Sequence, residues 1–311
     1  MEFFKQNTKI NFMAQRKWAA MVSAILFIAS IISFTVYGLN WGLDFTGGTE
    51  VQMSFPTAVD LNQVRDKLQN AGFKEAVVIS YGTSKDVLVS LAPKKGANDK
   101  DMNNKDEVVS QMMQVLPEAK VQQVDSIGAS VGQELATKGA LAIVVALLGT
   151  MIYIAFRFDF RFAIGSTVAL IHDPVLIMGV FSFFHIEFNL IGLAAVLTVI
   201  GYSLNDTIVI YDRIRENFRK MRKAAPIEVV NQAINQTLSR TIMTSMLTLV
   251  VVLALFFLGG AMLHGFALAL IIGIIVGTYS SIYVAGSLTL ALGLTRQHLL
   301  PVAKELLDDR P

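Results

Sequence analysis

The sequence predicts an α-helical polytopic membrane protein with six transmembrane helices and a ferredoxin-like α+β domain, of βαββαβ order, between the first two. Three observations predict this fold class. Hydrophobic residues make up 53% of the 311-residue chain and charged residues only 16%, a balance typical of proteins that lie largely in lipid. Six apolar runs have the length that crosses a bilayer. One long polar stretch, residues 38–138, alternates between strand and helix patterns.

The first span is predicted at residues 18–37, behind a segment (residues 1–17) rich in lysine and arginine. A cleaved signal peptide has a shorter apolar core that ends in a small-residue cleavage site. This run instead meets Tyr37, Gly38 and Trp41. We therefore predict an uncleaved helix whose N-terminus stays in the cytoplasm.

The other five spans are predicted within residues 139–293, at 139–156, 162–184, 190–211, 242–258 and 265–292. Lysine and arginine gather in alternate connections, at Arg157 and Arg161 and in the loop 212–241, in which an amphipathic surface helix is predicted from residue 225. The connections at residues 184–189 and 259–264 have no lysine or arginine. Because basic loops stay in the cytoplasm, both termini, including the tail 294–311, are predicted there, and the insert on the opposite side.

Within the insert, predicted strands at 49–55, 75–81, 86–91 and 119–127 are interleaved with helices at 60–71 and 105–116. The resulting βαββαβ order is that of a ferredoxin-like sandwich. Asp60 is a candidate N-cap of the first helix, and the polar tract 93–104 is predicted to be a loop. The insert has no histidine, and its acids and bases alternate as on a solvated surface, so we expect no catalytic site in it.

Two charged residues lie within or beside predicted spans. Asp206 lies roughly 24 Å below the start of the fourth span and Arg240 roughly 28 Å below the end of the fifth, at about 1.5 Å per residue, so the two reach a similar depth. A carboxylate in hydrocarbon costs several kcal/mol and is rarely present without a use. Two interpretations stay open: a functional buried pair, or rim residues whose side chains reach the headgroups.

Small and polar residues, including Gly201 and Asn205, recur at helical spacing beside Asp206. Such a face favours close packing on another helix over contact with lipid. Gly273 and Gly277 have GxxxG spacing in the sixth span, with the same consequence. These glycines indicate helix packing and no chemistry.

The third span carries His172, Asp173 and Pro174 near its middle. A buried histidine and aspartate can relay protons or help to bind a metal, although two ligands are too few for a metal site. Pro174 removes a helical hydrogen bond and predicts a kink. Equally, both side chains can simply satisfy the polar groups that the kink frees. Both interpretations stay open.

The segment that joins the first span to the insert contains Asp44, Gly47 and Gly48. Glycine adopts backbone conformations that other residues avoid, so the segment is a candidate hinge. It is equally compatible with an ordinary turn between a helix and a strand.

Several functions are excluded by missing residues. The chain has no cysteine, hence no disulfide, thiol nucleophile or cysteine metal site. It has no P-loop, HExxH motif or nucleophile elbow, so we expect no enzyme activity, no cofactor and no metal. Its basic residues follow the cytoplasmic rim, so binding to nucleic acid is not needed to explain them.

Three motifs resemble those of the SecD/SecF family of bacterial protein-export membrane proteins, which belongs to the resistance-nodulation-division superfamily. They are GLDFTGG at residues 42–48, ALIHD at 169–173, and GYSLNDT running into DRIREN at 201–217. The resemblance covers essentially the whole chain, including the order of the spans and the place of the insert. Pro174 departs from the family, which has an aliphatic residue there, and this bears on the local shape of the third span.

The resemblance implies a location in the bacterial inner membrane, with the insert in the periplasm, and a SecD partner that supplies six more spans. It implies that the complex works beside the SecYEG channel and the associated YajC, where proton flow drives the late translocation of preproteins. It also implies that Asp206 and Arg240 belong to the proton path, for which Asn205, His172 and Asp173 are further candidates. Two rival functions stay open: a proton-coupled half-transporter for a lipid or drug, and a passive scaffold of the export complex.

Overall fold

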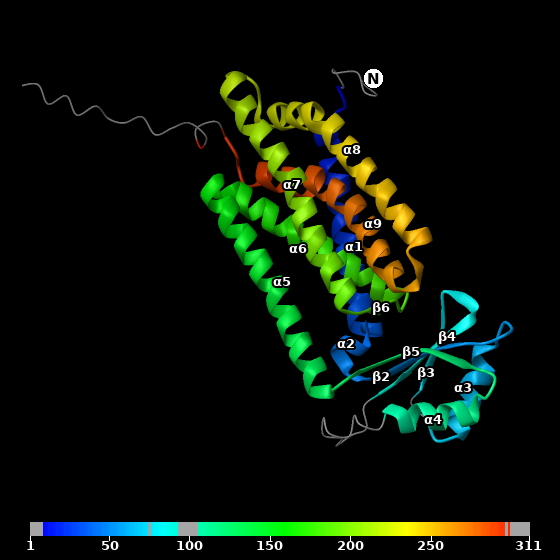
Figure 1. The fold of residues 1–311 in the computed structure, drawn as a ribbon. Coiled ribbons are helices and arrows are strands. Elements are labelled where there is room, and N and C mark those ends of the chain that lie inside the picture. The colour runs from blue at the N-terminus through cyan, green and yellow to red at the C-terminus, as the bar shows by residue number, and fades with distance from the viewer. Residues whose placement is uncertain (1–8, 74–75, 93–104, 296–297, 299–311) are drawn as a thin grey trace, which may run out of the picture.

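The computed structural model describes residues 9–73, 76–92, 105–295 and 298. Within these residues, six helices are long and apolar enough to cross a membrane, as predicted. Their bounds are α1 Arg16–Tyr37, α5 Ala129–Arg157, α6 Phe160–Phe183, α7 Leu190–Lys220, α8 Pro226–Leu258 and α9 Gly260–Ser280. The last of them continues through a short π-helix, Ser281–Ala285, into α10 Gly286–Ala291. The helices lie side by side in one bundle, and the α/β insert lies beyond one of its ends (Figure 1).

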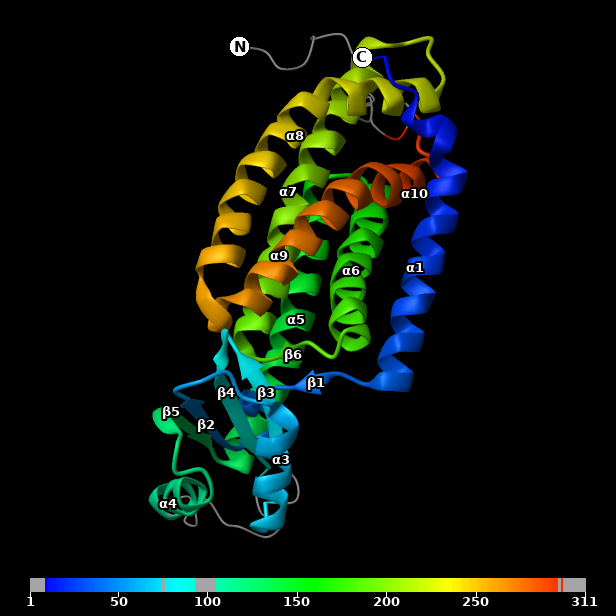
Figure 2. The ribbon, with the colours of Figure 1, turned by 90° about the vertical axis from the view of Figure 1, so that its right-hand side faces the viewer.

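Three of the helices extend well beyond the apolar runs that predicted them. Helix α5 begins at Ala129 rather than at residue 139, and α7 continues to Lys220. Helix α8 begins at Pro226, so the predicted surface helix and the fifth span form one continuous helix. Its first turns run across the end of the bundle before it turns along the other helices (Figure 2). Apolar runs mark only the part of a helix that suits lipid, whereas backbone hydrogen bonding continues through polar turns.

The insert has the ferredoxin-like fold that the sequence predicts. Its elements are β2 Gly48–Ser54, α3 Leu61–Asn70, β3 Val77–Tyr81, β4 Thr83–Leu91, α4 Lys105–Val115 and β5 Lys120–Ile127. The sheet is antiparallel in the order β3-β4-β2-β5. Asp60 caps α3, because its Oδ1 accepts a hydrogen bond of 2.9 Å from the N–H of Asn62. The predicted loop 93–104 and most of the predicted tail 294–311 lie outside the described residues.

A short two-stranded ladder joins the insert to the bundle. Strand β1 Asn40–Trp41 pairs in parallel with β6 Glu187–Phe188, which lies between α6 and α7. The N–H of Gly42 extends this ladder with a bond of 2.9 Å to the carbonyl of Phe188, and α2 Leu43–Thr46 follows at once. The entry to the insert is therefore fastened to the start of α7.

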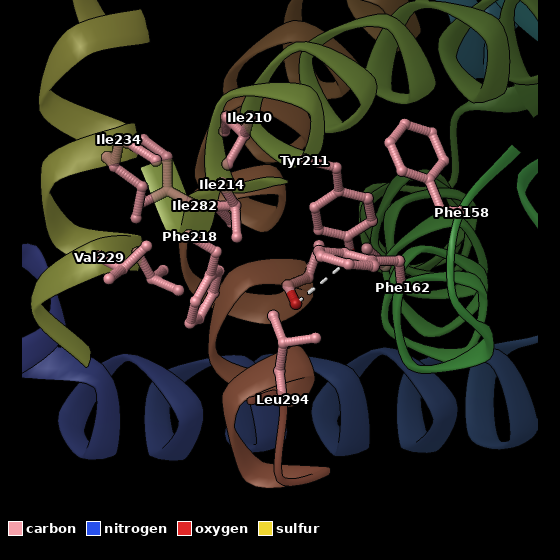
Figure 3. Packing of buried hydrophobic residues seen from close by; sticks show 14 of the residues in the cluster. Phe158, Phe162, Ile210, Tyr211, Ile214, Phe218, Val229, Ile234, Ile282 and Leu294 are labelled. Atoms are coloured by element: carbon pink, nitrogen blue, oxygen red, sulfur yellow. Dashed lines mark hydrogen bonds between the residues drawn. The ribbon is translucent and has the colours of Figure 1, made fainter. Parts of the chain in front are cut away.

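The largest buried cluster holds the opposite end of the bundle together. Figure 3 shows Tyr211 of α7 packed against Phe158 and Phe162, with ring centroids 5.9 Å and 4.5 Å away. Its hydroxyl donates to the carbonyl of Ala285 at 3.4 Å and accepts from Thr289 at 3.2 Å. These contacts tie α6, α7 and the end of the sixth span into one packed unit.

Candidate functional site

Asp206 is a buried carboxylate in the middle of α7. The residue is only 3% exposed, and its Oδ2 has no hydrogen-bond partner among the described residues. An unpaired carboxylate is costly to bury, so this side chain is accommodated best when it carries a proton or gains a cationic partner. The position is therefore suited to binding and releasing a proton.

Arg240, the cation that the sequence analysis paired with Asp206, lies on α8. Its charge is within electrostatic range of Asp206, but no ion pair joins the two in the part of the chain that the structure describes. Arg240 is exposed on the outer face of the isolated chain. The structure thus places the two charges near each other without pairing them.

Asp173 of α6 is the centre of a second buried polar cluster. Its Oδ1 lies 3.0 Å from Nδ1 of His172. Its Oδ2 accepts two hydrogen bonds, from Ser203 of α7 at 2.6 Å and from Ser280 of α9 at 2.9 Å. Three helices of the bundle therefore converge on one carboxylate, which is fully buried.

His172 closes the outer side of this cluster. Its ring stacks on Phe27 of α1, with centroids 6.1 Å apart and planes 4° from parallel. Its Nε2 is buried and has no partner in the described chain. Helix α6 continues on both sides of Pro174, so both side chains sit in an unbroken helical span.

The glycines of the sixth span lie where α9 meets α7. A Cβ at Gly277 would lie 3.1 Å from the Cβ of Ser203, and one at Gly273 would collide with Val199. Around the Cβ position of Gly201, by contrast, no described atom lies within 4 Å. Gly201 and Asn205 are exposed on the same side of α7, so their predicted packing role requires a helix from outside this chain.

The predicted hinge is a packed joint. Asp44 of α2 caps α7, since its Oδ2 accepts a hydrogen bond of 2.8 Å from the N–H of Leu190. Gly47 has φ +69°, and a Cβ on it would lie 2.7 Å from the Cα of Ala129, the first residue of α5. Gly48 also has a positive φ and lies against the carbonyl of Leu91. This segment thus connects the insert to the starts of α5 and α7, the helix that carries Asp206.

A carboxylate that the sequence analysis did not single out lies at the same joint. Glu50 of β2 accepts a hydrogen bond of 2.8 Å from Ser90. Burial raises the pKa of Glu50 to about 7 against the opposing effect of that bond, and the carboxylates of Glu187, Asp125 and Asp44 add to the rise. Burial also raises the pKa of Glu187 across the joint. The insert therefore meets the bundle through acids that repel one another when ionised.

We expect the joint to weaken as the pH rises. The folded chain holds the Glu50 proton more tightly than the unfolded chain, whose ordinary pKa is 4.5. Stability therefore falls as the pH rises from about 4.5 to 7 and levels off above. Glu50→Gln should flatten this pH dependence and raise the melting temperature at alkaline pH. The control Glu118→Gln changes an exposed acid of the same domain and should have neither effect. Equal pH dependence of the melting temperature in wild type and Glu50→Gln would contradict the assignment.

The fold and the buried groups define a class of protein. Among the described residues, six spans enclose two buried carboxylates, and a second domain is fastened to the helix that carries one of them, as in membrane transport proteins driven by ions. The chain belongs to the SecD/SecF family. The family model described as "Protein export membrane protein SecD/SecF, C-terminal" matches residues 107–295, more than half of the chain, and the "SecD/SecF GG Motif" model matches residues 32–59.

Relatives cover the chain almost completely. It is 46% identical to the protein translocase subunit SecF of Vibrio alginolyticus, over 96% of this chain and 95% of that protein. It is 45% identical to the protein translocase subunit SecF of Pseudomonas aeruginosa, over 97% of this chain and 98% of that protein. Both relatives confirm the family that the motifs predicted.

Two solved structures resemble the fold. SecDF from Thermus thermophilus, described as a translocon-associated membrane protein, matches with a TM-score of 0.84 and 37% identity, over 93% of this chain and 39% of that chain. SecDF in a super-membrane-facing form matches with a TM-score of 0.68 and 38% identity, over 92% of this chain and 39% of that chain. The present chain thus spans well under half of each solved chain.

Proposed function

We propose that this chain is a SecF-type subunit that, with a SecD partner, uses the proton motive force to drive late preprotein translocation beside SecYEG and YajC. The observation that carries the proposal is Asp206, a buried carboxylate whose Oδ2 has no hydrogen-bond partner among the described residues, in a bundle of this family. The chain does this without covalent chemistry. Its alternate basic connections support an inner-membrane orientation with both termini cytoplasmic and the insert periplasmic.

Protonation acts through the packing of α7. A proton on Asp206 removes its attraction for Arg240, so the two protonation states favour different arrangements of α7 and α8. Because Asp44 caps the other end of α7, a shift of this helix reaches the base of the insert. A potential of 100 mV supplies about 2.3 kcal/mol per charge, enough to bias a two-state element roughly fifty-fold.

Two further observations support this mechanism. The two SecDF structures match this chain with nearly equal identity and coverage but different TM-scores, so they differ from each other in arrangement. The exposed face of Gly201 and Asn205 leaves room for helices of a partner at the level of Asp206. The SecD partner is proposed to supply this cover.

The function is tested in inverted membrane vesicles from a strain that lacks this chain. Expression of the chain with its partner should restore gradient-stimulated translocation of a preprotein. If translocation is restored but does not depend on the proton gradient, the chain is a passive scaffold. No effect on translocation, together with loss of lipid or drug export, would indicate the half-transporter. Labelling of Lys220→Cys by an impermeant maleimide outside these vesicles checks the orientation, because the chain has no other cysteine.

A further inference from the structure

We infer that Ser203 and Ser280 are positioning residues that hold Asp173 as a second proton-exchanging carboxylate of the bundle, coupled through α7 to Asp206. This inference rests on the proposed proton coupling at Asp206. It assigns a task to two serines that lie on different helices and converge on the same oxygen atom, Asp173 Oδ2.

The surroundings of Asp173 suit a carboxylate that exchanges a proton. The described contacts of the ionised form are two hydroxyl donors and the imidazole of His172, and no lysine or arginine forms an ion pair with it. Hydroxyl donors stabilise a carboxylate without cancelling its charge. Among the described residues, the ionisable group in contact with it is His172 on its own helix. Helices α7 and α9 contribute the hydroxyls of Ser203 and Ser280, and the ring of Phe27 from α1 stacks on His172.

One residue of this cluster and one residue a turn along α7 from Ser203 each carry an unpartnered buried atom. Among the described residues, His172 and Asp206 are the ionisable side chains with a buried polar atom that lacks a partner, Nε2 and Oδ2 respectively. Asp173, which contacts His172, and Ser203, which is one turn from Asp206 on α7, are joined by the 2.6 Å hydrogen bond. Because Ser203 and Asp206 are three positions apart, they lie on the same face of α7. Ser203 therefore links Asp173 to the face of α7 that carries Asp206.

The helix contacts explain why both serines reach one oxygen. Gly277 lets α9 approach Ser203 closely, and its own Cβ position lies 3.6 Å from Asp173 Oδ2. Ser280 follows one turn later, directly before the π-helix Ser281–Ala285. Single π-turns inside helices are frequent at functional sites because they redirect side chains. The geometry therefore depends on the packing of α7 on α9, which the proposed movement of α7 would alter.

Removal of one hydroxyl donor takes away a hydrogen bond that stabilises the charged form of Asp173. In Ser280→Ala we expect the pH midpoint of gradient-stimulated translocation to move upward by about one unit. Ser203→Ala should shift it in the same direction. Ser280→Thr, which retains the hydroxyl, should restore the wild-type midpoint. A role in packing alone would lower the amount of folded chain without moving the midpoint.

The matched control is the next residue. Ser281 is fully buried like Ser280, but its hydroxyl donates to the carbonyl of Thr278 in its own helix, at 2.9 Å. Ser281→Ala should therefore leave the midpoint unchanged. The measurement is translocation in the same vesicles over a pH series, normalised to the amount of chain in the membrane.

The inference is overturned if the pH midpoint of translocation in Ser280→Ala and Ser203→Ala is the same as in the control Ser281→Ala. If Ser280→Ala does not accumulate in the membrane, the inference is tested with Ser203→Ala and Asp173→Asn, because each alters the cluster from another helix. Asp173→Asn is expected to lose the gradient stimulation, and full stimulation in it would also overturn the inference. Failure of the proposed function is distinguished by Asp206→Asn: retained stimulation there rejects the coupling itself, whatever the serines do.

Discussion

Asp206→Asn is expected to abolish the gradient-dependent part of preprotein translocation while the chain still accumulates in the membrane. Asparagine has nearly the shape of aspartate, so the packing of α7 is kept. It cannot bind or release the proton, however, and so the roughly fifty-fold bias that 100 mV gives a single charge is lost. The neutral side chain also removes a buried negative charge that has no ion-pair partner among the described residues, so stability should not fall.

Substitutions of Arg240 test the other half of the mechanism. In Arg240→Met, the remaining carboxylate is expected to keep its proton rather than lie buried and unpaired, so the gradient-dependent stimulation should again be lost. Arg240→Lys retains the charge but loses the planar fork of donors, and partial stimulation is expected. This order of effects separates a charge partner from an anchor at the membrane rim, for which lysine would serve as well as arginine.

The measurement is translocation into inverted vesicles with and without a proton gradient, at matched amounts of chain. Asp212→Asn is the control, because Asp212 lies on the same helix but is exposed and pairs with Arg157 at 3.1 Å. It should keep the full stimulation. If Asp206→Asn also kept it, Asp206 would be a packing residue and the proposed mechanism would be wrong.

Much of the fold was predictable because it follows from local patterns. Apolar runs locate the six spans, and alternating strands separated by turn residues predict the order of the insert. The ladder between β1 and β6 was not predictable, since two-residue strands have no periodicity and their partners are far apart in the sequence. The long polar extensions of α5 and α7 were missed because a helix can continue through polar residues beyond its apolar run.

The candidate site was predictable only in part. Charged residues such as Asp173 and Asp206 stand out in an apolar run, whereas Ser203 and Ser280 do not, because serine fits a membrane helix without any partner. Their convergence depends on the rotation of α7 and α9 about their axes. Counting the rise per residue predicts the depth of Arg240 but not the direction in which it faces. The structure shows it exposed, with no ion pair to Asp206 among the described residues. The neighbours of Glu50 likewise come from other elements.

Gly47→Ala is expected to be among the most destabilising single substitutions in the chain. Gly47 has φ +69° and ψ 171°, a region that is essentially restricted to glycine and costs other residues about 1–3 kcal/mol. The new Cβ would also lie 2.7 Å from Cα and 2.9 Å from N of Ala129. These are backbone atoms at the start of α5, so relief requires the joint itself to move, at a further cost of about 1–3 kcal/mol.

Gly38→Ala is a matched control, and its comparison with Gly47→Ala isolates the cost of the contact with Ala129. Gly38 has φ +72° and ψ −176°, nearly the conformation of Gly47, but no atom of the described chain lies within 4 Å of its Cβ position. It should therefore show the conformational cost alone. Melting temperatures of the two purified variants provide the comparison, and Gly47→Ala should melt lower and lose gradient-stimulated translocation more completely. Equal losses in both variants would mean that the contact of Gly47 with α5 contributes nothing and that the joint is held by other residues.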